Sequence, residues 1–204
     1  MKPSPSKLTR QEIYELFSRV GYRAPAHGLV TELAPAIIAT AWEESNPMTG
    51  RPLQQGPYTE PQVVLYTDEY ASGGNGMVLM SAQEALDKYP GNYCSEFLHS
   101  GDKASEAIRL LQVGCRRWLL KYRNPYDWKA SLGECEVAVM YEQEARYVDE
   151  IPYPLWAVDF IQVGRYGLLA VDFTREPSTE PISGVVTKSE ISSLVKDAER
   201  FFTR

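Results

Sequence analysis

The stretch from Leu155 to Phe173, LWAVDFIQVGRYGLLAVDF, contains the same short pattern twice. In each copy one aspartate, Asp159 or Asp172, is flanked by apolar residues that favour β-strands. The residues between the copies, Gln162–Tyr166, are of hairpin length, so the two copies are predicted to pair as antiparallel strands. Because side chains alternate along a strand, both aspartates are expected on one face, opposite to their apolar neighbours Val158, Phe160, Val171 and Phe173.

Two carboxylates that lie close together repel each other, so this hairpin needs a cation, a proton or an arginine between them. Oxygen ligands alone suit Mg²⁺, usually with phosphate oxygens completing its coordination. The repeat therefore makes Asp159 and Asp172 candidates for a metal site. The alternative, that both aspartates face water on an antiparallel sheet with one solvated side, stays open.

The first part of the chain has helical patterns. Thr9–Glu12 reads as a capping box that begins a helix ending at Gly21, and a second helix is expected over Val30–Ser45. Proline and glycine are frequent from residue 47 to residue 61, which is typical of a linker. We therefore expect a helical N-terminal segment with a Pro/Gly-rich linker over residues 1–60, followed by an α+β domain over residues 61–204.

Strands and helices alternate in this second part. The patterns predict strands over Val63–Tyr66, Met77–Met80 and Asn92–Leu98, with a glycine-rich turn at Ala71–Gly76. Apolar residues at helical spacing predict an amphipathic helix over residues 104–121, with Arg109 on its outer side. A capping box at Thr187–Glu190 begins a terminal helix.

From about Pro61 to Phe202, the order of these elements resembles the ATP-grasp family. That family clamps ATP between two α+β lobes and activates a carboxylate as an acyl phosphate for attack by an amine or another nucleophile. The closing motif, Asp159, then a hairpin, then Asp172-Phe173-Thr174 before Pro177, is similar to the metal-binding carboxylates of the family. The resemblance implies an antiparallel sheet with packed helices, and it implies ATP and Mg²⁺ as cofactors.

The same resemblance assigns roles to individual residues. Asp159, Asp172 and Thr174 would hold Mg²⁺. Gly73, Gly74 and Gly76 would let the backbone approach the phosphates. Glu96, on the strand Asn92–Leu98, corresponds to the glutamate that precedes the adenine contacts. The substrate beside the nucleotide would be an unidentified small molecule or protein.

This sequence also departs from the family. Threonine stands at Thr174 where the family has asparagine, and no lysine occurs between Lys7 and Lys88. Other cations, Lys121, Lys129 or Arg175, would have to supply the positive charge. Two functions therefore remain open, a Mg²⁺-dependent nucleotide-binding protein of the ligase type and a non-catalytic adaptor, inhibitor or protein-interaction module on the same scaffold.

Composition excludes several classes of protein. The 204 residues carry a net charge of −6, which disfavours a nucleic-acid or anionic-membrane binder. No apolar stretch of about 18 residues is present, so no membrane span is expected. The first residues lack the apolar core of a signal peptide, and we expect a cytoplasmic protein with reduced thiols.

Three further features of the sequence are candidates for a functional role. Cys94 and His99 could form a nucleophilic pair, and Glu43 or Glu44 could be a general acid of a hydrolase. Aromatic residues and prolines cluster between residues 122 and 156, which is typical of an interface or a pocket wall. This cluster is the candidate surface for a protein partner or for a homo-oligomer: Tyr122, Tyr126, Trp128, Tyr153 and Trp156.

Overall fold

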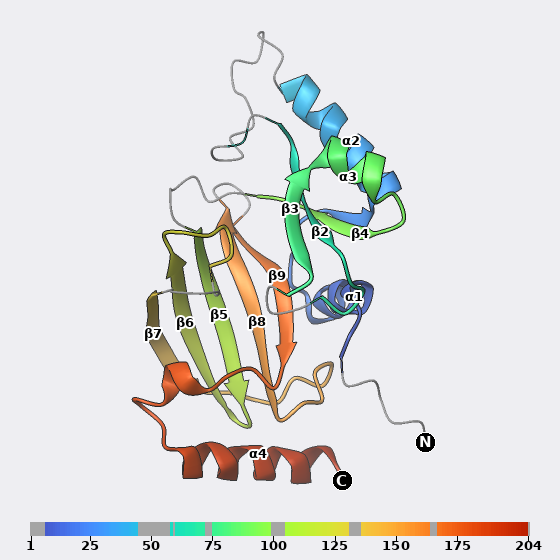
Figure 1. Cartoon of the computed structure of the whole chain (residues 1–204). Helices are drawn as coiled ribbons and strands as arrows, with labels where there is room; N and C mark the ends of the chain where they lie inside the picture. The colour runs from blue at the N-terminus through green and yellow to red at the C-terminus, as the bar shows by residue number, and fades with distance from the viewer. Residues whose placement is uncertain are drawn as a thin grey trace.

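The computed structural model of the chain contains two antiparallel sheets, each covered by helices (Figure 1). The residues that it describes are 7–44, 58, 60–71, 75–98, 105–130, 136–163 and 167–203. Gly73 and Gly74, His99, and most of the expected linker lie outside these residues. The mixed helices and antiparallel sheets confirm the α+β class.

The small lobe is a four-stranded sheet with the strand order β1-β4-β2-β3. Its strands are β1 (His27–Leu29), β2 (Gln62–Tyr66), β3 (Met77–Ser81) and β4 (Tyr93–Glu96). Helices α2 (Val30–Glu44) and α3 (Ala82–Lys88) pack on one face, where they bury Val63, Leu65 and Cys94. Val64 and Tyr66 alternate to the opposite face and join a different apolar cluster, so β2 is buried on both sides.

The large lobe is a five-stranded sheet with the strand order β7-β6-β5-β8-β9. Its strands are β5 (Ser105–Val113), β6 (Arg116–Asn124), β7 (Glu136–Glu144), β8 (Leu155–Val163) and β9 (Gly167–Arg175). Ile182 of the short 3-10 helix η2 (Glu180–Ile182) is buried with residues of β5 and β6, and α4 (Lys188–Phe202) packs against the same cluster. Figure 1 shows α4 lying across one end of the strands.

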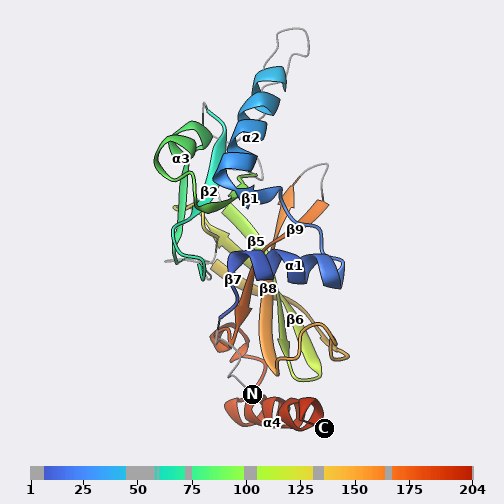
Figure 2. The ribbon, with the colours of Figure 1, turned by 90° about the vertical axis from the view of Figure 1, so that its right-hand side faces the viewer.

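Helix α1 (Arg10–Val20) lies between the two lobes (Figures 1 and 2). Thr9 caps it as predicted, since its hydroxyl accepts from the Glu12 amide and Glu12 accepts from the Thr9 amide. Ile13 and Phe17 of α1 share one core cluster with Val64 of the small lobe and Val158 of the large lobe. The helix therefore fills the space at which the lobes meet.

The N-terminal segment is built into both lobes. Strand β1 pairs with β4, and α2 packs against α3 and the small sheet. The expected division of the chain after residue 60 stays a prediction. Among the described residues, the segment before residue 45 shares its cores with the rest of the chain.

The helix predicted over residues 104–121 is wrong. This segment forms the two strands β5 and β6, which are joined by a tight turn at Gly114 and Cys115. Strand β5 is buried on both faces, because Leu110 packs with α1 and Leu111 packs with η2. A strand with apolar side chains on both faces shows no alternation of polar and apolar residues. Its apolar residues then also match a helical spacing.

The hairpin at the repeated aspartates is confirmed, with one irregularity. Strands β8 and β9 pair with Asp159 opposite Asp172, and a β-bulge follows between Asp159 and Phe160. Val158 and Phe173 enter the core as expected, but the expected position of Val171 is wrong. The bulge shifts the register, so Val171 borders a cleft together with the two acids.

Candidate functional site

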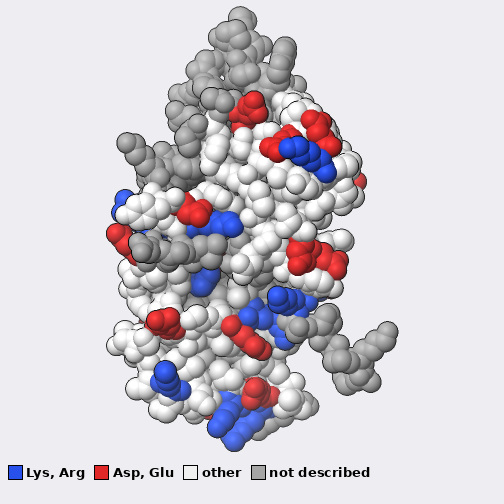
Figure 3. Space-filling view, in the orientation of Figure 1, with Lys and Arg blue, Asp and Glu red and all other residues white. Residues whose placement is uncertain are grey.

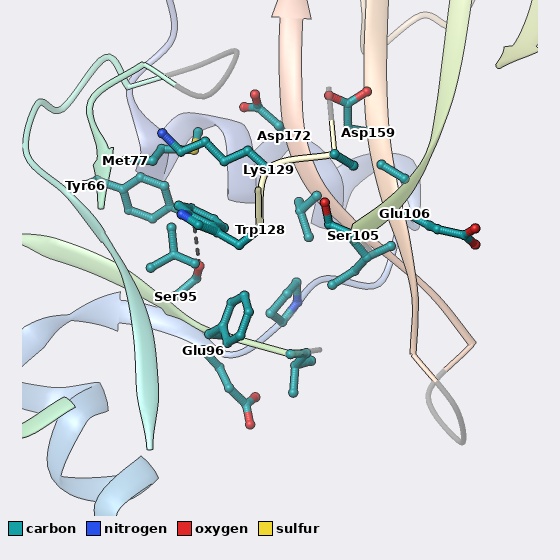
Figure 4. A pocket seen from close by; sticks show the side chains of 18 residues that line it. Tyr66, Met77, Ser95, Glu96, Ser105, Glu106, Trp128, Lys129, Asp159 and Asp172 are labelled. Carbon is teal, nitrogen blue, oxygen red and sulfur yellow. Dashed lines mark hydrogen bonds between the residues drawn. The ribbon is translucent and has the colours of Figure 1, made fainter. Parts of the chain in front are cut away.

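A cleft of about 140 Å³ lies between the two lobes (Figure 4). Strands β2, β3 and β4 contribute one wall, and strands β5, β8 and β9 contribute the other. The loop after β6 closes it with Trp128 and Lys129, which extend toward the small lobe in Figure 4. Most of the lining side chains are apolar, and these include Pro25, Val64, Met77, Phe97, Ile161 and Val171.

Trp128 connects the two walls of the cleft. Its ring meets that of Phe97 edge to face with 6.0 Å between the ring centroids. The amine of Lys129 lies 5.2 Å from the centroid of the same Trp128 ring. An aromatic ring held in this way offers a flat, rigid apolar surface to a planar ligand.

Asp159 and Asp172 lie close together at one edge of the cleft, as the sequence predicted (Figure 4). Asp159 is paired with Arg109, the residue opposite it on β5. The Arg109 guanidinium donates to both carboxylate oxygens, with Nε–Oδ1 at 2.6 Å and Nη2–Oδ2 at 2.7 Å. A two-point pair of this kind is among the strongest hydrogen-bonded arrangements of charged side chains.

Asp172 is paired with Arg10, which reaches it from α1. Arg10 Nη1 donates to Asp172 Oδ1 at 2.6 Å, and Nη2 donates to the Tyr66 hydroxyl at 2.9 Å. The same guanidinium also donates to the carbonyl oxygens of Ala71 and Val171. Arg10 is 1% exposed, so this network joins α1, the small lobe and the large lobe within a buried region.

Both guanidinium groups stay charged. Burial by itself lowers the pKa of Arg109, but the hydrogen bond and the negative charge of Asp159 outweigh it, and the pKa lies above the usual value. Burial also lowers the pKa of Arg10, while Tyr66 and Asp172 raise it, again with a net increase. Each acid of the pair therefore faces one permanent positive charge.

Asp159 and Asp172, which we call the acid pair, are a poor fit to a divalent metal. Among the described residues, no group of three or more His, Cys, Asp or Glu side chains could hold a metal ion. Thr174 lies on β9 opposite Ala157, and it is not one of the residues that line the cleft. The structure thus brings Asp159 and Asp172 together without Thr174, and the ligation of Mg²⁺ by these three residues stays a prediction.

The other predicted residues lie around the cleft. Gly76 immediately precedes β3 with a φ of 69°, and a Cβ atom there would be 3.1 Å from the Ala71 Cβ, so this tight turn requires glycine. Gly73 and Gly74 fall outside the described residues. Glu96 lines the cleft, and its carboxylate points away from the acid pair in Figure 4.

Of the cations considered from the sequence, Lys129 reaches the cleft. Lys121 forms an ion pair with Glu106 at 3.0 Å, and the Arg175 guanidinium lies 3.9 Å from the centroid of the Tyr153 ring. The sequence does not predict a role for Arg10, and the expected position of Arg109 on the outside of a helix is wrong. A signal for Arg109 was its position inside the apolar run of β5, whereas nothing near Arg10 in the sequence indicates its partner.

The possible nucleophile Cys94 is buried. Cys94 is 0% exposed, and burial raises the pKa of its thiol to about 12, so the thiol is protonated at neutral pH. Its possible partner His99 lies outside the described residues, as do the side chains of Glu43 and Glu44.

The aromatic cluster of residues 122–156 is largely internal. Tyr122 and Trp156 are buried in the core, and Trp128 lines the cleft. Tyr126 is 83% exposed. An interface with a protein partner at this cluster stays a prediction, and Tyr126 is its most exposed described member.

No described helix has the length and the apolar character that crossing a bilayer requires. On the face seen in Figure 3, acidic and basic side chains are mixed over both lobes.

Comparison with solved structures identifies similar folds. The ATP-grasp ligase PsnB, in complex with the precursor peptide PsnA2 and AMPPNP, has a TM-score of 0.54 and 8% sequence identity over 97% of this chain and 60% of that chain. A RiPP-associated ATP-grasp ligase from Chryseobacterium gregarium, in complex with ADP and a leader and core peptide, has a TM-score of 0.54 and 12% identity over 92% of this chain and 58% of that chain.

At this level of identity, the similarity shows the fold alone, which is ATP-grasp-like. The chain spans about 60% of the length of PsnB and 58% of the length of the other ligase. No protein-family model matches the sequence, and no curated protein does.

Proposed function

We propose that the chain binds a nucleotide in the cleft between its lobes. The observation that carries this proposal is that an ATP-grasp-like fold places a cleft between its two sheets and borders it with both Trp128 and the acid pair. An aromatic ring among apolar side chains is a surface on which a purine base stacks favourably. The ligases of similar fold hold AMPPNP or ADP, which supports a nucleotide as the ligand here.

Within this proposal, the site favours nucleotides with few phosphates over ATP, and therefore binding without catalysis over ATP-dependent ligation. ATP carries several negative charges, and placing them in a partly buried site without compensation is unfavourable. Lys129 is the one lysine or arginine among the described residues that line the cleft. The charges of Arg109 and Arg10 are already balanced by Asp159 and Asp172. A nucleotide-binding adaptor or inhibitor module therefore agrees with these contacts better than a Mg²⁺-dependent ligase.

Isothermal titration calorimetry with ATP, ADP, AMP and adenosine tests this proposal. We expect saturable binding by the wild-type chain, and we expect Trp128→Leu to raise the dissociation constant about tenfold, as the loss of one stacking partner does. Tyr126→Leu is the matched control, because it removes an exposed aromatic side chain outside the cleft. It should bind like the wild type.

Two results would contradict the proposal. The first is the absence of heat with all four compounds at millimolar concentration. The second is binding that Trp128→Leu does not weaken, while circular dichroism shows that the variant is folded.

A further inference from the structure

Two arginine side chains balance the negative charge of the acid pair. Asp159 and Asp172 lie directly opposite each other on adjacent strands, and each side chain is only 10% exposed. Two ionised carboxylates in this position require positive charge close by. Arg109 and Arg10 supply two positive charges for the two negative ones, so the group of four side chains is neutral without any ion.

We propose that the guanidinium groups of Arg109 and Arg10 take the place of a divalent cation at this acid pair, so that the cleft binds nucleotide without Mg²⁺. This inference rests on the proposed nucleotide site. It concerns what compensates the acids there, and it excludes the ligation of Mg²⁺ by Asp159, Asp172 and Thr174 that the sequence predicted.

At least three of the four carboxylate oxygens accept hydrogen bonds from nitrogen donors. Both oxygens of Asp159 accept hydrogen bonds from Arg109. Oδ1 of Asp172 accepts from Arg10 Nη1 and also from the Phe173 amide, at 2.6 and 3.0 Å. Mg²⁺ needs these same oxygens at short distance and in a near-octahedral arrangement, so metal and guanidinium compete for them.

The arginines are held too firmly to make room. Arg10 has three further acceptors in Tyr66, Ala71 and Val171. The Arg109 guanidinium carbon lies 4.9 Å from the centroid of the Tyr122 ring, which adds a cation–π contact. An arginine does not lose its proton in a protein, so an entering metal would meet two fixed positive charges. Coulomb repulsion in this buried region therefore excludes the metal.

Two measurements test the inference. The first is calorimetric titration with ATP in excess EDTA and again in millimolar Mg²⁺, for the wild type and for the double variant Arg109→Gln with Asp159→Asn. Because Mg²⁺ also binds ATP in solution and lowers its charge, the ratio of the two dissociation constants is compared between the two proteins, and we expect it to agree within about twofold. A ratio that differs about tenfold or more, with Mg²⁺ favouring binding to the wild type alone, would overturn the inference and support the metal site predicted from the sequence.

The second measurement is the titration of Mn²⁺ alone, followed by its electron paramagnetic resonance signal. We expect the chain to leave Mn²⁺ free. Binding of Mn²⁺ that Asp159→Asn abolishes would overturn the inference even if no nucleotide binds. The two proposals can therefore fail separately. The absence of heat with and without Mg²⁺ would contradict the nucleotide site, whereas Mn²⁺ binding would contradict the inference that arginines take the place of the metal.

Variants add a positive test. Arg109→Gln frees the Asp159 carboxylate, and we expect the folded variant to gain Mn²⁺ binding that the wild type lacks. The double variant Arg109→Gln with Asp159→Asn removes both charges and should not gain it. Arg116→Gln is the matched control, because Arg116 pairs with Glu142 outside the cleft. Equal Mn²⁺ binding by Arg109→Gln and the double variant would count against the role of Arg109.

Discussion

Arg10 links α1 to both lobes. It is almost fully buried, and its guanidinium donates to Asp172 of β9 and to Tyr66 of β2. Replacing Arg10 by methionine keeps much of the side-chain volume but leaves Asp172 without its cation. Breaking a buried pair by removing one partner costs about 3–5 kcal/mol. We expect Arg10→Met to lower the free energy of unfolding in urea by an amount of this order.

Two comparisons control this prediction. Arg10→Met combined with Asp172→Leu removes both charges, so it should cost less than the single substitution. Arg19→Met changes an exposed arginine of the same helix and should be nearly neutral. A loss of less than about 1 kcal/mol for Arg10→Met would show that the buried pair does not stabilise this junction.

His27 gives the stability of the chain a pH dependence. Its ring stacks on Tyr14 with 3.9 Å between the centroids, and its Nδ1 is joined to the Tyr93 hydroxyl by a hydrogen bond of 2.8 Å. Burial lowers the pKa of His27, and the charge of Arg10 lowers it further. The unfolded chain therefore binds the His27 proton at a higher pH than the folded chain, so stability falls as the pH drops through about 6.5.

The measurement is urea unfolding at about pH 7.5 and about pH 5.5, for the wild type and for His27→Gln. We expect the free energy of unfolding to decrease more in the wild type than in the variant on going to the lower pH. An equal decrease in both proteins would mean that His27 does not contribute to the pH dependence.

At the scale of elements, the turn between β5 and β6 determines where α4 can pack. Gly114 has a φ of 55°, and a Cβ atom placed on it would lie 2.5 Å from the Leu194 carbonyl oxygen of α4. Any side chain at this position is strained and also forces α4 away from the sheet. We expect Gly114→Ala to lower the free energy of unfolding by about 2 kcal/mol or more.

Gly91→Ala is the matched control for this substitution. No atom lies within 4 Å of a Cβ placed on Gly91, and its φ is outside the left-handed region. Equal unfolding midpoints for the two alanine variants in urea would contradict the proposed contact between the turn and α4.

Local patterns predicted the elements whose signals lie within a few residues. The capping residues Thr9 and Thr187 begin α1 and α4 as expected, because each contacts a glutamate three residues ahead. The hairpin of β8 and β9 was predictable from the repeated apolar pattern around the two aspartates. Strands β5 and β6 were not, since burial on both faces of β5 removes the alternation that marks a strand.

The acid pair could be predicted from the sequence, but the groups that balance it could not. Arg10 and Asp172 are 162 residues apart in the chain, and only the packing of α1 between the lobes brings them together. Arg109 meets Asp159 because β5 lies next to β8, and this neighbour relation requires β5 to be a strand. Because a helix was wrongly predicted for residues 104–121, Arg109 could not be recognised as the partner of Asp159.

At the scale of the whole molecule, the two lobes form one cleft, and the charge of its acidic end is balanced by arginines. The core cluster around α1 includes residues of both sheets, so the walls of the cleft are held in place by apolar packing as well as by Arg10. Such a site is preorganised for a ligand, and a preorganised site loses less conformational freedom on binding. This supports the proposed binding of a nucleotide whose base contacts the apolar wall.

A crystal structure of the chain grown with AMPPNP and Mn²⁺, with the anomalous signal of manganese recorded, tests the proposed metal-free nucleotide site most directly. We expect a nucleotide between the lobes with its base against Trp128, Arg109 still bound to Asp159, and no anomalous peak at the acid pair. A nucleotide bound elsewhere, or a manganese ion between Asp159 and Asp172 with the arginines displaced, would contradict this proposal.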